Sequence, residues 1–293
     1  MPNLNVTRTS EYAYHNPAGL LRHRLMIRPH DSHDLWLHAA TIAVEPESQS
    51  IRWAHDVLGN SVSVLDWASE TRTTLLHIVS ALMVTHNPSG SAARLTTRDS
   101  GAETFPFSYA AERIPDLGPL TERQFPDPDG LVDGWARGFV TGAASPLTLG
   151  ILEAMTQAIQ QNLRYPARDA EGTQTPADTL TLDSGTCRDF ALLMMEAAGS
   201  LGFAARFVTG YLYDCGATLA CCTVYLPGAG RVEYGRPNRV HVGVNFIRVE
   251  AARAPSQALP AAAGYLGNRA DPKGLSVDVT VEVTQDEAAL QAA

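Results

Sequence analysis

The stretch SGTCRDF, residues 184–190, is the most informative part of the chain. An apolar run follows it and ends before Gly202, which predicts a helix over 187–201 with Cys187 in its first turn. A thiol in that position lies beside unpaired backbone N–H groups and the positive end of the helix, and both favour the thiolate. The same N–H groups can stabilise an oxyanion next to the sulfur. Cys187 is therefore a candidate nucleophile, although an inert core cysteine is the common alternative.

The sequence on both sides of this stretch predicts helices followed by antiparallel strands. Apolar residues with helical spacing follow residue 146, and short apolar runs predict strands over 205–212, 220–226, 231–234, 241–249 and 276–283. This order of elements is typical of an α+β domain, which we assign to residues 131–293.

The first hundred residues predict a different architecture. Short apolar runs at 24–29, 35–44, 50–53, 61–67 and 75–84 are separated by turn-forming residues. This spacing favours an antiparallel, sandwich-like β-domain over residues 1–100. Five prolines interrupt residues 101–130, so we expect an extended connector there.

Composition excludes several classes of protein. The net charge is −9, the wrong sign for a protein that binds nucleic acid or an anionic membrane. No apolar run reaches the roughly 18 residues of a membrane-spanning helix, and the first residues lack the pattern of a secretory signal. Four cysteines in 293 residues do not indicate a disulfide framework. We therefore expect a cytoplasmic protein, compatible with a homo-oligomer, and we find no motif for a metal or a cofactor.

The residues around Cys187 resemble those of the bacterial transglutaminase-like superfamily, whose members are papain-fold cysteine enzymes. The resemblance rests on GTQTP at 172–176, GTCRDFA at 185–191, LGFAARFVTGYL at 201–212 and VYLPGAG at 224–230. Residues 14–29, 56–60 and 64–67 resemble the β-domain that precedes the catalytic domain in this group.

The resemblance implies a fold and a site. The expected fold is α+β, with an N-terminal antiparallel β-sandwich-like domain followed by a papain-like catalytic-type domain. The implied site has a Cys-His-Asp triad built on Cys187, with Gln174, Gly185 and Thr186 at the substrate and oxyanion positions. The implied partners are peptide or protein substrates.

Two of the three triad positions depart from that pattern. Alignment on the Tyr-Leu-Pro-Gly turn places Leu219 at the histidine position and Cys221 at an adjacent tryptophan position. Gly235 falls on the aspartate position and Phe246 on a later histidine. Neither Leu219 nor Gly235 can take a proton from the thiol or return one to a leaving amine. The sequence therefore predicts a degenerate triad in which Cys187 remains.

A substitute base has few candidates in the second half of the chain. Its one histidine is His241, expected on a strand, where a partly exposed position without a catalytic role is the simpler interpretation. Asp189, Asp214 and Glu233 are carboxylates that could assist a base, although capping or solvated roles are simpler for each.

The other cysteines allow further alternatives. Side chains alternate along a strand, so Cys221 is expected on the same face as Leu219 and directed toward Cys187. A Cys187–Cys221 disulfide is conceivable, as is a thiolate metal site with Cys215 and Cys222, but small apolar packing is simpler.

Three hypotheses follow. In the first hypothesis, the chain is a binding pseudoenzyme that keeps Cys187. In the second, it is an active cysteine peptidase, amidase or acyl-transferase with a substituted base such as His241. The third hypothesis is an altered thiol chemistry in which the substrate supplies the base.

Overall fold

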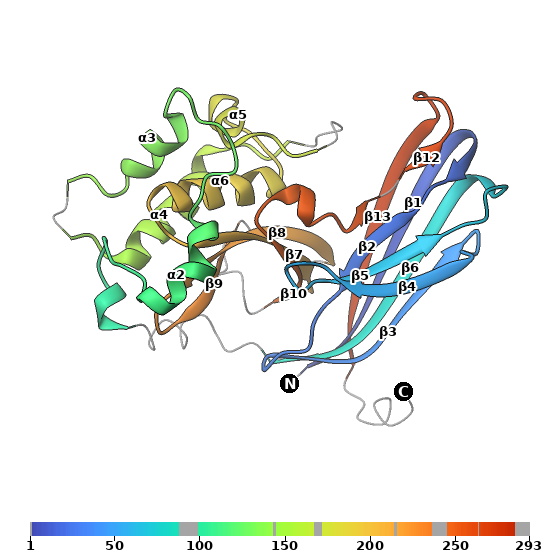
Figure 1. The fold of residues 1–293 in the computed structure, drawn as a ribbon, viewed down its shortest axis with the longest axis horizontal. Coiled ribbons are helices and arrows are strands. Elements are labelled where there is room, and N and C mark those ends of the chain that lie inside the picture. The colour runs from blue at the N-terminus through green and yellow to red at the C-terminus, as the bar shows by residue number, and fades with distance from the viewer. Residues whose placement is uncertain are drawn as a thin grey trace.

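The computed structural model describes residues 2–87, 99–142, 145–166, 172–213, 216–235, 245–262 and 264–284. In these residues, two sheets pack face to face, and a smaller sheet covered by helices lies beside them (Figure 1). The expected fold class, a strand-rich N-terminal part followed by an α+β part, is confirmed.

The strand-rich part is an antiparallel sandwich with an apolar interior. Its strands are β1 (Asn3–Leu20), β2 (His23–Arg28), β3 (Leu35–Glu45), β4 (Ser50–His55), β5 (Ser61–Asp66), β6 (Arg72–His86), β11 (Ala261–Ala262), β12 (Tyr265–Leu266) and β13 (Pro272–Thr284). One sheet has the order β12-β1-β6-β3, with β13 also paired to β1, and the other has the order β11-β2-β5-β4. Leu25 and Leu65 from one sheet meet Leu76 and Ile78 from the other, and all four are at most 1% exposed. This shared interior holds the two sheets together.

Strand β1 is missing from the sequence-based expectation. Leu4, Val6, Arg8 and Ser10 are buried in strict alternation with partly exposed neighbours. Two of these four side chains are polar, so the alternation of apolar residues is too short to stand out in the sequence. The strand forms because its backbone pairs on both sides, with β6 and with β13.

The last strands of the described chain pair with the sandwich, although they lie within the expected domain of 131–293. The expected strand at 276–283 exists as part of β13, but it pairs along β1, with Val279 opposite Arg8. Strands β11 and β12 likewise pair with β2 and β1. Figure 1 shows β13 running beside β1. Alternating valines predict a strand but do not specify which sheet it joins, and the long β1 offers the free edge.

The Pro-rich connector contains short helical turns and lies on the core. Its helix α2 (Ile114–Leu117) has four residues and is flanked by 3-10 turns. The Tyr109 hydroxyl donates to the carbonyl of Tyr225 at 3.0 Å and accepts from the backbone N–H of Ala204 at 2.8 Å. The buried carboxylate of Glu196 accepts from the backbone N–H groups of Gln124 and Phe125. These contacts fix the connector against the helical part.

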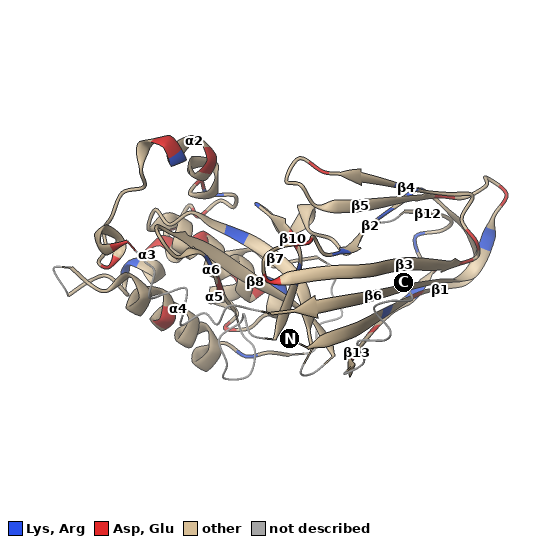
Figure 2. Ribbon diagram, turned by 90° about the horizontal axis from the view of Figure 1, so that it is seen from below, with Lys and Arg blue, Asp and Glu red and all other residues tan. Residues whose placement is uncertain are grey.

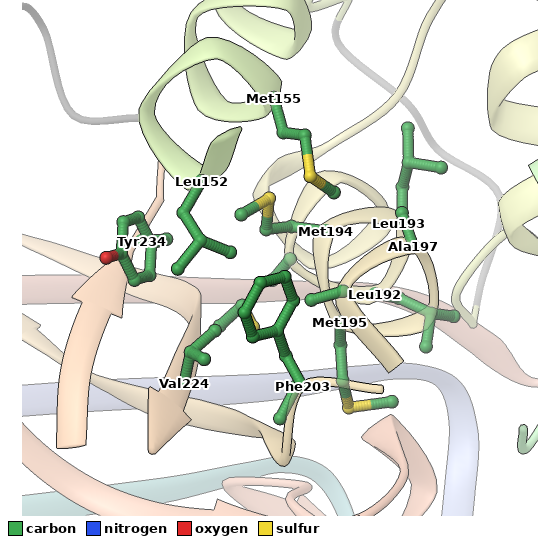
Figure 3. Packing of buried hydrophobic residues seen from close by; sticks show 14 of the residues in the cluster. Leu152, Met155, Leu192, Leu193, Met194, Met195, Ala197, Phe203, Val224 and Tyr234 are labelled. Atoms are coloured by element: carbon green, nitrogen blue, oxygen red, sulfur yellow. The ribbon is translucent and has the colours of Figure 1, made fainter. Parts of the chain in front are cut away.

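Helices cover one face of an antiparallel sheet in the second part. The helices are α3 (Leu131–Arg137), α4 (Thr148–Asn162), α5 (Pro176–Thr181) and α6 (Cys187–Ser200), and the strands are β7 (Ala205–Leu212), β8 (Ala217–Leu226), β9 (Gly230–Tyr234) and β10 (Phe246–Ala252), in the order β10-β7-β8-β9. In Figure 3, Leu152 and Met155 of α4 lie around Met194 of α6, and Phe203 and Val224 close the cluster on the sheet side. The central helix α6 is thereby buried along most of its length.

The small sheet is joined to the sandwich by a continuous apolar cluster. Leu4 and Val84 of the sandwich pack with Tyr211 and Ile247 of the small sheet, and all four are at most 3% exposed. The Tyr211 hydroxyl donates to the carbonyl of Ile27 at 3.2 Å. Burial of this size makes the two parts one packed unit.

Surface charge and helix length agree with the composition. Figure 2 shows basic and acidic positions interspersed along the ribbon rather than gathered on one element. Among the described residues, no helix has the length and apolar character to cross a membrane.

Candidate functional site

Cys187 is the first residue of α6, as expected, and the loop before it is held by one carboxylate. Asp189, which has no exposed surface, accepts from the backbone N–H of Thr186 at 2.7 Å and from its hydroxyl at 2.9 Å. Its second oxygen accepts from the backbone N–H of Gln174 at 2.6 Å. Acidic groups are favoured at a helix N-terminus, and this one also ties the preceding segment to it. Asp189 therefore fixes Cys187 and is not placed to act as a base.

The residues expected at the oxyanion site are engaged within the same loop. The backbone N–H of Gly185 donates to the carbonyl of Arg164 at 3.1 Å. The backbone N–H of Thr186 donates to the Asp189 carboxylate. The Gln174 side-chain amide donates to the carbonyl of Ser184 at 2.9 Å. A Cβ on Gly185 would lie 2.8 Å from the Cβ of Asp189, so this position requires glycine.

The Cys187 side chain packs against an apolar cluster from β7, β8 and β10. Its members are Val208, Leu212, Leu219, Cys221 and Phe246, all buried. Leu219 and Cys221 lie on the same face of β8, opposite Gly210 and Val208 of β7, as the alternation of strand side chains predicts. Within the described ranges, this cluster places hydrocarbon and the sulfur of Cys221 against the Cys187 side chain.

No hydrogen bond of the Cys187 side chain occurs in the described ranges. His241, Asp214 and Cys215 lie outside the described residues. Glu233, the remaining candidate carboxylate, accepts from the Arg248 guanidinium at 3.0 Å. Gly235 follows β9, where its carbonyl accepts from the Gln160 side chain at 3.2 Å.

The neighbouring thiols are inert by burial. Cys187, Cys221 and Cys222 are all free, so the Cys187–Cys221 disulfide does not form. Burial raises the pKa of Cys221 well above its usual range, and burial also raises that of Cys222. Both thiols therefore remain protonated at neutral pH. In the described ranges, no group of three or more potential ligands could hold a metal ion.

Two charged residues behind the cysteine escaped the sequence analysis as site residues. Arg188 donates to the carbonyls of Pro255 and Ala258, at 2.8 and 3.2 Å, and its guanidinium lies over the ring of Phe207. Glu250 of β10 is 2% exposed, and burial raises its pKa to about 8. Arg188 lies within residues 184–190, so its position next to Cys187 could have identified it. Glu250 has no such local feature, because its contacts come from distant segments.

Comparisons with known proteins agree with this architecture. Residues 4–85 match the bacterial transglutaminase-like N-terminal region, and residues 133–246 match the transglutaminase-like superfamily. No curated protein matches the sequence.

Two solved structures illustrate the range of similarity. A putative cysteine protease from Cytophaga hutchinsonii superposes with a TM-score of 0.71 at 17% identity, over 98% of this chain and 92% of that one. The periplasmic domain of TgpA from Pseudomonas aeruginosa has a TM-score of 0.34 at 15% identity, over 78% of this chain and 86% of that one. The first likeness shows that the fold is shared along nearly the whole chain.

Proposed function

We propose that this protein, which carries a bacterial transglutaminase-like N-terminal region and a transglutaminase-like core, is a pseudoenzyme that binds peptide or protein segments. The observation that carries the proposal is the apolar surround of Cys187, formed by Leu219, Cys221 and Phe246. In the proposal, Leu219 and Gly235 stand where the superfamily has its histidine and aspartate.

Reactions at an amide bond need proton transfers that an apolar surround cannot provide. Acyl transfer from an amide needs a base for the thiol proton and then an acid for the leaving nitrogen. A helix N-terminus favours the thiolate but cannot carry a proton to the leaving group. Loss of general acid–base assistance costs roughly 10²–10⁴-fold in rate, and more where nucleophile and base act as a unit. Peptidase and transamidase turnover should therefore be very weak.

A binding role is supported by the surface beside the cysteine. Arg164 pairs with Asp183 and Gly185 through its backbone, which brings the next residue, Tyr165, to the loop that carries Cys187. Tyr165 and Leu182 are 55% and 52% exposed. Exposed apolar side chains beside a half-buried cysteine form a surface that suits a peptide side chain.

An alkylation experiment tests the missing base. In the wild type, the pH dependence of the rate at which iodoacetamide modifies Cys187 should show no histidine-dependent phase. Leu219→His combined with Gly235→Asp should add a phase near the histidine pKa and speed labelling at pH 6.5 by about tenfold. Leu212→His, in the same cluster, is the matched control and should add no such phase. Circular dichroism confirms that each variant is folded.

One result would replace this proposal with an active cysteine enzyme. If wild-type labelling already shows a histidine-dependent phase, and His241→Ala removes it, then His241 supplies the base.

We also propose a cytoplasmic location. The three free thiols at Cys187, Cys221 and Cys222 support a reducing compartment. Fractionation of the native host tests this, and recovery in an oxidising compartment would contradict it.

A further inference from the structure

A cavity of about 180 Å³ lies between the sandwich and the small sheet, apart from Cys187. His30, Asp34 and Asn60 line it from the sandwich, and Arg206, Arg248 and Glu250 line it from the core. Asn60 fixes the junction at its wall, because its side-chain amide donates to and accepts from the backbone of Ala251, both at 2.9 Å. The cavity therefore lies at a junction that hydrogen bonds between the two parts hold together.

Arg206 of β7 is a cation without a partner at this cavity. Its guanidinium makes no hydrogen bond or ion pair in the described part of the chain, and its Nε is buried without an acceptor. Burial, with the nearby charges of Arg231 and Arg248, lowers the pKa of Arg206 to about 9, so it still carries its charge at neutral pH. Arg206 is half-buried, and a cation that is partly withdrawn from water without a protein partner favours an anionic ligand.

The neighbouring charges do not neutralise Arg206. Arg248 donates to both oxygens of Asp34, at 2.6 and 2.8 Å, and to Glu233 at 3.0 Å. Arg231 adds a further positive charge near Arg206, whereas Asp34 and Glu233 are already bonded to Arg248. A negative charge in the cavity could therefore pair with Arg206.

Glu250 adds a hydrogen-bond donor to the same cavity. One carboxyl oxygen accepts from the Thr209 hydroxyl at 2.9 Å, and the other, Oε1, is buried with no hydrogen-bond partner among the described residues. Because burial raises the pKa of Glu250 to about 8, the side chain is mostly a neutral acid at pH 7. Its O–H can then donate to an acceptor in the cavity.

We propose that this interdomain cavity binds a carboxylate ligand of about one amino-acid residue in size. The Arg206 guanidinium pairs with the carboxylate, and the neutral Glu250 donates to one of its oxygens. Water can fill the volume but cannot supply the missing negative charge, and a phosphate dianion would bring one charge too many. The shared chemistry is a terminal carboxylate, carried by a free small acid or by the C-terminus of a peptide.

Calorimetric titration of the full chain tests the proposal. N-acetylglycine should bind, and N-acetylglycinamide, which has the same shape without the charge, should bind at least tenfold more weakly. Inorganic phosphate should also bind more weakly than N-acetylglycine. A short peptide with a free C-terminus that binds more tightly than N-acetylglycine assigns the site to peptide ends, and the reverse order assigns it to small acids.

Variants separate binding from folding. Arg206→Met should abolish binding of N-acetylglycine without lowering the melting temperature of the ligand-free protein, because the guanidinium has no hydrogen bond or ion pair to lose in the described ranges. Glu250→Gln should retain binding within about threefold, since the amide still donates. Arg137→Met, at an exposed helix arginine, is the matched control and should bind as the wild type does.

Two results would overturn the assignment. One is equal affinity for N-acetylglycine and its amide, or binding of neither, which would mean that the cavity does not recognise a carboxylate. The other is unchanged binding in Arg206→Met. The site does not involve Cys187, so Cys187→Ala should bind normally, and this outcome is independent of the proposed pseudoenzyme role.

Discussion

Replacing Arg248 by methionine should strongly destabilise the protein. Arg248 lies on β10 and bridges two carboxylates that are each 3% exposed, Asp34 from the sandwich and Glu233 from β9. The three donor–acceptor distances are 2.6, 2.8 and 3.0 Å. Arg248→Met removes the guanidinium that these three bonds share and keeps both buried carboxylates. Removing one member of a buried ion pair costs about 3–5 kcal/mol, and we expect a loss in this range.

A graded series distinguishes this explanation from simple loss of packing. Asp34→Asn keeps an acceptor for Arg248 and leaves Glu233 as its counter-charge, so it should cost about 1–2 kcal/mol. The triple variant with Asp34→Asn, Glu233→Gln and Arg248→Met removes all three charges of this cluster. It should recover most of the stability that Arg248→Met loses. Equilibrium unfolding in urea, followed by tryptophan fluorescence and circular dichroism, measures each free energy. The reasoning fails if Arg248→Met costs less than about 1 kcal/mol, or if the triple variant is less stable than Arg248→Met.

Three further predictions follow from burial and geometry. Burial raises the pKa of Glu250 from 4.5 to about 8, so the folded state binds this proton more tightly than the unfolded state does. The stability of the protein should therefore fall as the pH rises from 4.5 through 8. Thermal melts should show a flatter pH profile for Glu250→Gln than for the wild type, and an unchanged slope would contradict the prediction. Iodoacetamide should label Cys187 at least about a hundredfold faster than Cys221, which must wait for the structure to open; peptide mass spectrometry measures the order, and faster labelling of Cys221 would refute it. Gly185→Ala should lower the free energy of unfolding by about 1–3 kcal/mol, because the added Cβ would lie 2.8 Å from a neighbouring atom. Gly134→Ala, in open space within a helix, should raise it by about 0.5–1 kcal/mol. Urea unfolding measures both variants, and equal effects would contradict the steric explanation.

Local sequence signals predicted the elements that carry Cys187. The apolar run after residue 186 gives the helix α6, and the position of Cys187 at its start follows from the residues before it. Strand alternation likewise placed Leu219 and Cys221 on one face of β8. These features depend on neighbours within a few residues, which is the range that a sequence pattern reports.

The contacts that join the two parts could not be predicted in this way. Arg248 and Asp34 are separated by 214 positions, and neither has a local feature that indicates a pair. The pairing of β13 with β1 joins the two ends of the chain, although β13 itself was expected as a strand. Arg206 lacks a hydrogen-bond or ion-pair partner among the described residues. That depends on which residues surround it in the folded protein, so the sequence alone does not reveal it.

The most direct test of the central claim is turnover by the wild-type protein on generic peptide and amine-acceptor substrates. Cys187→Ala and His241→Ala are measured beside it under the same conditions. We expect wild type and Cys187→Ala to release product at the same background rate, because the Cys187 side chain has no hydrogen-bonded base in the described ranges and packs against apolar residues. Robust wild-type turnover that is lost in both variants would contradict the account and make His241 the base. Turnover lost in Cys187→Ala alone would also contradict it, in favour of a base supplied by the substrate.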